Sequence, residues 1–473
     1  GLLAIVGFVI VNLRDLLIQF LVGGTNDDED PFLWLLQNGF APVAIVLISA
    51  GLVLFVAGFY FSWRMHSFRI TDEVVEVRSG ILFRTNRRAR LDRIQGINVV
   101  RPIVARLIGV AKVEVDVAGQ GGKVQLSYLG SAEADELRRE ILLLASGTRP
   151  APTSATPRGG SFLEQRASEL LGPELDPALA PPASVVQLDL GRLLGSIILS
   201  EFTVVIVVGA VLVAALVSVF GSPVYLFGFI PGIIGFGSYY VRRFTRSLRY
   251  SIAGTPDGVR VGFGLLSTSN ETIPPGRIHA VQIRQPLLWR APGWWEITIN
   301  RAASSSGNNA NEQAQTTILP VGDLDDVRRV LALVLPAFMD ATSISLVERG
   351  LTSRGGDDGF ANSPARATPL LWFSRRRNGF ALARDAVLLR RGAIWRRLVI
   401  VPLARVQSVA LQQTPVSRAL RLAAIRVHTV RGPIEARLRG IDADGATSFF
   451  MDLADAAVRS ARTDTSHRWR TAS

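Results

Sequence analysis

The segment Val401-Pro-Leu-Ala-Arg-Val-Gln-Ser-Val409 places Arg405 13 residues after Gly392 and 13 residues before Arg418. The same order of a glycine and two arginines, with the same two spacings, occurs twice more upstream. Three occurrences of two fixed spacings predict an internal repeat of roughly 80 residues, which decides the architecture of the chain. The repeat-defining residues are Gly80, Arg93 and Arg106 in copy one, Gly264, Arg277 and Arg290 in copy two, and Gly392, Arg405 and Arg418 in copy three.

The residues around these positions also agree in kind. Each first arginine is followed by a short run with apolar residues at its ends, and two copies place a proline three residues before that arginine, where copy one has Arg90. A β-branched or alternating run precedes each repeat glycine and an apolar run follows it, which is typical of a β-hairpin with a glycine in the turn. The runs are Ile94–Ile97, Ile278–Val281 and Val406–Val409, and the prolines are Pro274 and Pro402.

Each copy closes with an amphipathic pattern that predicts a helix. Further strand patterns lie between the hairpin and this helix, so the order predicts a strongly bent or barrel-like antiparallel sheet capped by a C-terminal helix. Ser131, Asp323 and Asp442 stand where helix N-caps are expected. The closing helices are expected at Ala132–Leu144, Leu324–Leu335 and Ala443–Val458.

Four apolar segments are long enough to cross a bilayer as helices, for which about 20 residues suffice. They pair into two hairpins, the first with a loop that holds the acidic run Asp27–Asp30 and the second with a tight turn at Gly221–Pro223. The sequence starts at Gly1 inside the first segment and without Met, which leaves open whether residues precede it. The expected spans are Leu2–Val22, Val43–Phe61, Leu193–Phe220 and Val224–Val241.

Basic residues stand just outside the expected spans, and neither hairpin loop contains one. By the positive-inside rule, both loops face outward and all three repeats face the cytoplasm. The sequence therefore predicts a multi-pass plasma-membrane protein. The basic residues that carry this prediction are Arg64, Arg69, Arg192, Arg242, Arg243, Arg246 and Arg249.

Two stretches between the units have a linker-like composition. Thr148–Ala183 is rich in Pro, Ala, Ser and Gly, which predicts a flexible linker, and Thr352–Thr368 contains a Gly/Asp-rich run that predicts disorder. The expected plan is a transmembrane hairpin (1–63), repeat domain one (64–147), a linker (148–190), a second hairpin (191–241), repeat domain two (242–338), a linker (339–369), repeat domain three (370–460) and a tail (461–473).

This plan, together with Val401–Val409 and Arg376-Arg-Asn-Gly-Phe-Ala-Leu382, resembles the bacterial pleckstrin-homology-like (PH-like) membrane proteins of the YdbS/YdbT group over nearly the whole chain. Copy one departs from the motif at Arg90, and copy two carries a Ser/Asn/Gly-rich insertion at Ala302–Gln315. The resemblance implies three PH-like domains, each a bent seven-stranded sheet with a C-terminal helix, tethered to the plasma membrane. It implies no enzymatic activity and no established ligand, and phosphoinositide binding would be an analogy from the fold alone.

Two basic clusters are candidates for binding anionic lipid headgroups or a partner, because such headgroups attract basic residues by about 1 kcal/mol each. One cluster directly follows the fourth span, where fixing the topology is an equal alternative. The other has no adjacent span, which favours surface or partner binding. The clusters are Arg242, Arg243, Arg246 and Arg249, and Arg375, Arg376 and Arg377.

The six repeat-defining arginines favour a structural interpretation, because a residue present in every copy serves something that every copy shares. We expect each to form a salt bridge or a backbone hydrogen bond that holds a turn. For the aromatic group Trp289, Trp294 and Trp295, packing in the core or contact with the membrane interface is favoured over a binding site.

Signatures of catalysis and metal binding are lacking in the sequence. Cysteine is absent, which excludes disulfides and thiolate metal sites, and the four histidines are scattered. No GxSxG motif or P-loop is present, and Gly262-Phe-Gly264 lies in an expected hairpin rather than before a helix. We expect no enzymatic activity, no cofactor, no metal and no nucleic-acid partner.

The sequence thus predicts a non-enzymatic, polytopic membrane scaffold that combines α-helical hairpins with three β-rich PH-like domains. These domains are expected to bind the lipid bilayer, a membrane-protein partner or a second copy, in envelope maintenance or stress defence. The alternative is a transporter or channel component that uses Arg14, Asp15 and Glu201, because isolated charges inside a membrane are costly and often functional. A local Arg–carboxylate pairing between spans, or exposure of Glu201 near the cytoplasmic interface, would also account for these charges and is favoured over a transport role.

Overall fold

The computed structural model describes residues 67–71, 73–80, 84–102, 105, 108–117, 123–145, 186–221, 250–255, 258–263, 268–274, 276–301 and 316–464, with scattered positions between 46 and 65 and between 232 and 247. The chain divides into two compact units. Residues 1–66 and 79–84 form one, and residues 67–78 and 85–473, which hold most of each repeat, form the other. In the first unit the described positions from Val46 to Arg64 are helical, in agreement with the helix expected at Val43–Phe61. The expected span Leu2–Val22 lies outside the described residues.

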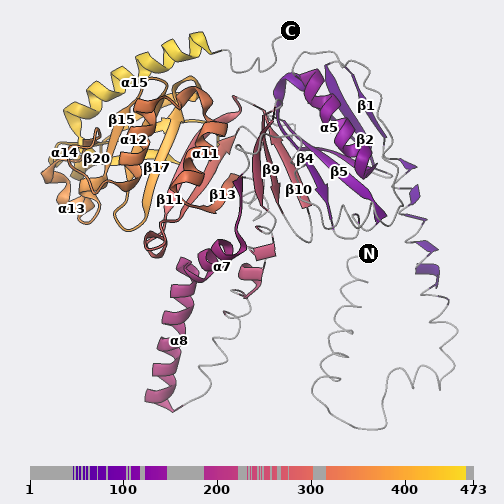
Figure 1. The fold of residues 1–473 in the computed structure, drawn as a ribbon, viewed down its shortest axis with the longest axis horizontal. Coiled ribbons are helices and arrows are strands. Elements are labelled where there is room, and N and C mark those ends of the chain that lie inside the picture. The colour runs from indigo at the N-terminus through magenta and orange to yellow at the C-terminus, as the bar shows by residue number, and fades with distance from the viewer. Residues whose placement is uncertain are drawn as a thin grey trace. The chain divides into compact units, whose positions relative to one another are not determined.

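Copy three shows the plan of one repeat most completely. A first antiparallel sheet is followed by a second sheet of three strands, and a long helix closes the copy (Figure 1). Gly392 has a φ of +84° between two paired strands, and a Cβ there would collide with the carbonyl oxygen of Trp395. The elements are β14 (Ala361–Asn362), η6 (Ala365–Ala367), α13 (Thr368–Leu371), η7 (Arg375–Arg377), β15 (Gly379–Leu382), β16 (Ala386–Arg391), β17 (Arg396–Pro402), η8 (Leu403–Arg405), β18 (Ser408–Gln412), α14 (Pro415–Ala419), β19 (Leu422–His428), β20 (Ala436–Asp442) and α15 (Ala443–Thr463).

Copies one and two follow the same order. Gly80 has a φ of +110° directly after β2, so the expected glycine turn is confirmed there as it is at Gly392, while Gly264 lies outside the described residues. Copy one contains β1 (Ser67–Ile70), β2 (Val74–Ser79), β3 (Thr85–Arg90), η1 (Leu91–Arg93), β4 (Ile94–Arg101), β5 (Val110–Val117), β6 (Lys123–Gly130) and α5 (Ser131–Ala145). Copy two contains β7 (Val186–Gln187), β8 (Ser251–Thr255), β9 (Gly258–Phe263), β10 (Thr268–Ile273), β11 (Ile278–Gln285), η4 (Leu288–Arg290), β12 (Trp295–Arg301), β13 (Thr317–Gly322) and α11 (Leu324–Val334), then η5 (Pro336–Phe338).

The three closing helices begin close to where the sequence predicts. The Asp323 side chain accepts from the Asp326 amide in a capping box, and the Asp442 carboxylate accepts from the Gly445 amide at 2.9 Å. These two N-caps are confirmed. Ser131 is instead the first helical residue of α5, and its hydroxyl accepts from Arg101 at 2.8 Å, so that N-cap prediction was wrong.

The sheets do not stop at the boundaries of the copies. One seven-stranded sheet has the order β6-β5-β4-β10-β9-β8-β7, which joins copy one to copy two through β4 and β10. A second has the order β13-β12-β11-β17-β16-β15-β14, which joins copy two to copy three through β11 and β17. We call each of these two junctions a seam. At each seam, the second sheet of one copy pairs with the first sheet of the next (Figure 1).

The two seams have the same register. Ile97, four residues after the first arginine of copy one, lies opposite Thr272, eight residues after the glycine of copy two. Val281 and Ile400, the residues at the same two positions of copies two and three, lie opposite each other in the second seam. The two seams are thus repetitions of one antiparallel pairing.

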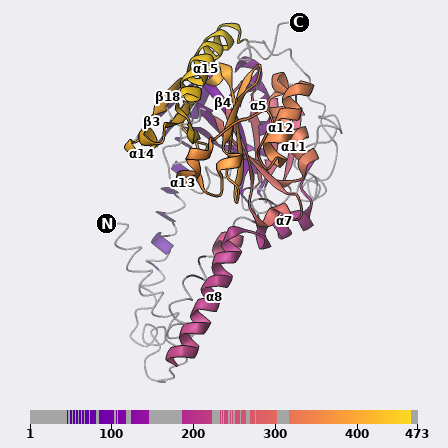
Figure 2. The same ribbon diagram turned by 90° about the vertical axis from the view of Figure 1, so that its left-hand side faces the viewer.

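The sheet that joins copies two and three is covered on both faces, which explains its continuous apolar strands. Leu388, Leu398 and Ile400 point into a core shared with α11 and α12 (Ala341–Thr352). Val399 and Val401 point to the other face, into a core closed by β18–β20 and α15. Figure 2 shows α11 and α12 on one side of these strands and α15 on the other.

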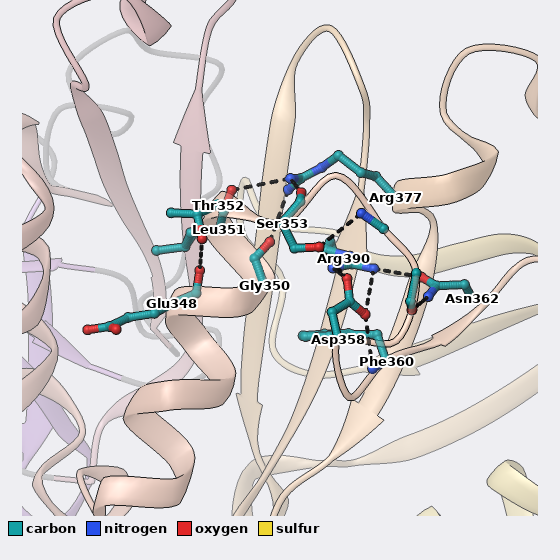
Figure 3. Close-up of polar contacts among 12 residues, drawn as sticks. Glu348, Gly350, Leu351, Thr352, Ser353, Asp358, Phe360, Asn362, Arg377 and Arg390 are labelled. Carbon is teal, nitrogen blue, oxygen red and sulfur yellow. Dashed lines mark hydrogen bonds and ion pairs between the residues drawn. The ribbon is translucent and has the colours of Figure 1, made fainter.

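The expected linker at 339–369 is largely structured, and the prediction of disorder at Thr352–Thr368 was wrong. Val347 and Leu351 of α12 are buried in the core of copy two, and β14 adds a strand to the sheet of copy three. Asp358, from the Gly/Asp-rich run, forms an ion pair with Arg390, whose side chain is fully buried (Figure 3). A buried guanidinium needs a counter-charge, and composition alone did not reveal that this loop supplies it.

The expected third span is shorter than predicted. Leu193 and Ile197 belong to a separate helix, α7 (Leu190–Ile198), and are buried; the Trp289 indole donates to the Ser196 carbonyl at 3.3 Å. Ser200 caps α8 (Glu201–Phe220), which has a mean hydropathy of 2.9 and no buried residue. Among the described residues, α8 is the one helix long and apolar enough to cross a membrane.

Replacing Asp358 with Asn should destabilise the chain by about 3–5 kcal/mol, because it leaves the Arg390 guanidinium buried without a counter-charge. Chemical denaturation of the purified full-length chain measures this change. Asp357→Asn is the matched control, since Asp357 is exposed and adjacent, and it should leave the unfolding midpoint unchanged. Equal effects of the two substitutions would contradict a structural role for the Asp358–Arg390 pair.

Candidate functional site: an exposed aromatic corner and a basic seam

The three side chains of the Arg375–Arg377 cluster do not form one exposed surface. The Arg377 side chain is buried, and its guanidinium donates to the carbonyls of Gly350 at 3.0 Å, Leu351 at 3.3 Å and Ser353, at the end of α12 (Figure 3). The last carbonyls of a helix lack partners within it, and a cation there is favourable. We therefore remove Arg377 from the candidate lipid- or partner-binding residues.

The electrostatic environment of Arg377 is unusual. Burial lowers the pKa of its guanidinium to about 9, and the neighbouring Arg396, Arg390 and Arg290 act in the same direction. At neutral pH the group still carries its charge. Positive charge is therefore concentrated between copies two and three.

Arg376 is exposed and follows three exposed apolar side chains within six residues of sequence. Leu370 is 48%, Trp372 75% and Phe373 68% exposed, and the two aromatic rings stack with their centroids 4.7 Å apart. We name Leu370, Trp372, Phe373 and Arg376 the aromatic corner. The sequence pattern pointed only to the arginines, although Leu370-Leu-Trp-Phe373 precedes them with a single serine between.

The composition of the aromatic corner fits a membrane surface. Exposed large apolar side chains on a folded domain mark interaction sites, and Trp is enriched where bilayer meets water. A neighbouring guanidinium adds attraction for anionic headgroups. Arg375 is partly buried with Nη1 3.5 Å from the Ser363 carbonyl oxygen, so it contributes less to this surface.

The other basic cluster, Arg242, Arg243, Arg246 and Arg249, lies outside the described residues, as do Arg14 and Asp15. Glu201 is the first residue of α8, and its carboxylate lies 3.9 Å from the Arg284 guanidinium. Arg284 belongs to β11 rather than to a span, and the Glu201 side chain is 45% exposed, so this geometry differs from the expected pairing between spans and agrees with exposure of Glu201 at the end of its helix. Trp289 and Trp295 are 1% and 4% exposed, so the expectation of core packing is confirmed for these two.

The repeat-defining arginines of copy two join neighbouring copies. The Arg277 guanidinium donates to the Asp92 carbonyl of copy one at 2.9 Å. The Arg290 guanidinium donates to the carbonyls of Ala393 and Ile394, the latter at 2.7 Å, in the hairpin of copy three. The expectation of backbone bonds was correct for these two, but the bonded carbonyls belong to the adjacent copies rather than to a turn of the same copy.

The remaining repeat-defining arginines differ in their surroundings. Arg405 forms an ion pair with Asp464 at 2.9 Å. Arg93, at the start of the array, and Arg418, at its end, are exposed, and Arg106 lies outside the described residues.

A cavity of about 670 Å³ opens where copies two and three meet, and Arg290, Arg354 and Arg396 line it. Burial lowers the pKa of Arg396, and the adjacent Arg290 and Arg354 lower it further. The residues that line this cavity include no carboxylate. The cavity therefore attracts anions, although Arg290 and Arg396 also form hydrogen bonds between copies two and three. Elsewhere in the described part of the chain, no group of three His, Cys, Asp or Glu side chains is placed to hold a metal ion.

Three successive units, each built from a bent pair of antiparallel sheets closed by a helix, define the pleckstrin-homology-like class. The chain belongs to the bacterial PH domain family, whose model matches residues 12–145, 194–335 and 331–457. The third match begins inside α11, well before the expected domain boundary at 370.

The chain is also similar to the UPF0699 transmembrane protein YdbT of Bacillus subtilis (strain 168), with 20% identity over 284 residues. The alignment covers 56% of this chain and 55% of that relative, so the chain spans about half the length of the curated relative it matches. The suspected family is thereby confirmed.

His279 supplies a pH-sensitive element of the second seam. Burial, together with the nearby positive charges of Arg405 and Arg277, lowers the pKa of its imidazole to about 4. Between about pH 6.5, the ordinary value, and pH 4, the unfolded chain binds a proton that the folded chain does not. Stability should therefore fall as the pH decreases through this window.

Replacing His279 with Gln should remove that part of the acid sensitivity. Denaturant midpoints of the full-length chain at pH 7 and pH 5 measure it: the midpoint of the unmodified chain should drop more on acidification than that of the variant. An identical drop in both chains would contradict the assignment of this sensitivity to His279.

Proposed function

We propose that this protein is a non-enzymatic membrane scaffold, in which α8 anchors three joined PH-like domains at the cytoplasmic face of the plasma membrane. The observation that carries this proposal is the contrast between α7 and α8. Leu193 and Ile197 fix α7 in copy two, whereas the 20 apolar-rich residues of α8 that follow bury none of their side chains. A helix that is hydrophobic all round and uncovered by protein requires a lipid environment.

The multi-pass arrangement in two hairpins is part of the same proposal. Arg192 lies in the first turn of α7, ahead of α8, and the cluster at Arg242, Arg243, Arg246 and Arg249 directly follows the fourth expected span. The net charge of +13, with acidic residues in the first expected loop, supports cytoplasmic PH-like domains. A role in envelope maintenance or stress defence remains a proposal of the same kind.

The shared sheets support a scaffold rather than three independent binding modules. Copies two and three share one buried core, and the copies are joined by backbone pairing at both seams. Domains joined in this way keep their spacing and orientation when they bind a surface. A transporter would instead use charges along a path, and Glu201 lies beside Arg284 at the first turn of α8.

We further propose that the aromatic corner touches the bilayer. Trp372 and Phe373 would enter the interfacial region, while Arg376 would pair with anionic headgroups, with an electrostatic range of about 8 Å at physiological salt. The corner adds a second membrane contact to the anchor provided by α8.

This contact can be tested with Trp372→Cys, since the chain has no native cysteine. The full-length variant, labelled with a polarity-sensitive fluorophore and reconstituted into vesicles, should emit at shorter wavelength in anionic than in neutral vesicles, and high salt should reduce the difference. Trp395→Cys, at a tryptophan that is 46% exposed on another hairpin, is the matched control and should not respond. Equal responses at both positions would count against the aromatic corner.

A further inference from the structure

We propose that chains of this protein associate head to tail, with β18 of one chain pairing antiparallel with β3 of a second copy. Within the described residues, β18 ends the sheet β18-β19-β20 and β3 ends the sheet β1-β2-β3. β18 is the counterpart of β4 and β11, and β3 is the counterpart of β10 and β17. The two ends of the array are thus the two halves of the seam that the chain already forms twice.

The repeat fixes the register that the intermolecular seam would have. Within the chain, Val99 lies opposite Asn270 in the first seam, and Ile283 lies opposite Leu398 in the second. The counterpart of Val99 and Ile283 in copy three is Leu411, six residues after the first arginine. The counterpart of Asn270 and Leu398 in copy one is Asn86, six residues after the glycine. Leu411 of one chain is therefore placed opposite Asn86 of the next.

The exposure of the side chains at these positions indicates that the edge strand β18 of copy three lacks the covering that β4 and β11 have. Val99 packs in the core of copy one and Ile283 in the core shared by copies two and three, and both are 0% exposed, whereas Leu411 is 37% exposed. A second chain would bury Leu411 as the other two positions are buried. An aliphatic side chain opposite an asparagine already occurs in the first seam, where Val99 lies opposite Asn270.

Local bonding around the asparagine is also repeated. The Asn270 side chain accepts from Arg260 on β9 at 2.7 Å, and the Asn86 side chain donates to Glu76 on β2 at 2.7 Å. Glu76 and Arg260 occupy the same position of their copies. β3 therefore presents Asn86 from the same strand pair as β10 presents Asn270, with Asn86 exposed and Asn270 buried.

The repeat-defining arginines provide a second, independent argument. Arg277 reaches back to the Asp92 carbonyl of the preceding copy, and Arg290 reaches forward to the hairpin of the following copy. Their counterparts at the open ends are Arg93 and Arg418, and both are exposed. In a head-to-tail pair, Arg93 would donate to the Ala404 carbonyl of the neighbouring chain, the counterpart of Asp92.

Charge repulsion disfavours a symmetric pairing of two β3 strands and favours the heterologous pairing of β18 with β3. β3 carries Arg87, Arg88 and Arg90, so two β3 strands would place like charges opposite each other. β18, with the sequence Ser-Val-Ala-Leu-Gln, is neutral and accepts the arginine-rich strand. A heterologous contact that repeats forms a ring if its rotation closes and a filament if it does not.

The absence of cysteine allows a direct test in the full-length chain. Residues opposite each other in an antiparallel pair have Cα atoms about 4.5–5.5 Å apart, within the range that a disulfide spans. The variant with both Asn86→Cys and Leu411→Cys, oxidised in membranes, should give a ladder of dimers, trimers and larger species on a non-reducing gel. The control combines Asn86→Cys with Val416→Cys, since Val416 is exposed on α14 beyond β18, and should remain largely monomeric.

Three results would overturn the proposal. The first is cross-linking no greater than in the control pair. The second is an equal yield of dimers from Leu411→Cys alone, which would mean that β18 pairs with itself. The third is a disulfide that forms within one chain and leaves its mass unchanged.

If Arg93 bonds to the neighbouring chain, its removal should weaken cross-linking without destabilising the fold. Arg93→Gln, added to the cross-linking variant, should reduce the ladder while leaving the denaturation midpoint of the chain unchanged, because Arg93 is exposed. Arg459→Gln, an exposed arginine on α15, is the matched control and should leave the ladder intact. A ladder equally strong with Arg93→Gln would remove Arg93 from the interface.

Discussion

Backbone pairing between the second sheet of one copy and the first sheet of the next is the interaction on which the rest of the structure depends. A sheet edge carries a row of donors and acceptors that need partners when they are buried. Here β4 supplies them to β10 and β11 supplies them to β17, in one register. This pairing sets the relative placement of the copies, buries the strand centres and brings Arg277 and Arg290 to carbonyls of their neighbours.

The two seams have the same strand register but are held by different side-chain interactions. In the first, Arg301 forms ion pairs with Glu271 and, at 3.4 Å, with Asp116, and all three side chains are buried. In the second, Ile283 and Leu398 pack in a shared core, and Asn300 exchanges hydrogen bonds of 2.9 and 3.0 Å with the backbone of Ile434. Because each buried charge needs its partner, we expect removal of any one of these three side chains to destabilise the first seam. The second depends mainly on packing.

The sequence predicted the repeat, most strands and the closing helices. The spacing of Gly80, Gly264 and Gly392 from the arginines of their own copies, and the apolar periodicity, are local signals. It did not predict that sheets cross between copies, because strand pairing depends on contacts between residues far apart in the chain. It missed the order in 353–367, since the role of Asp358 follows from a buried partner, Arg390, 32 residues away. For the candidate site, it pointed to Arg376, but not to the burial of Arg377 or the exposure of Trp372.

Hydrogen–deuterium exchange of the purified full-length chain tests the shared sheets most directly. The account predicts that amides of β10 and β17 exchange as slowly as those of the inner strands β9 and β16, because each is hydrogen-bonded on both sides. Amides of β18, at the end of its sheet, should exchange faster in a dilute, monomeric sample. Fast exchange of β10 and β17, like that of an edge strand, would contradict the seams and with them the joined array of PH-like domains.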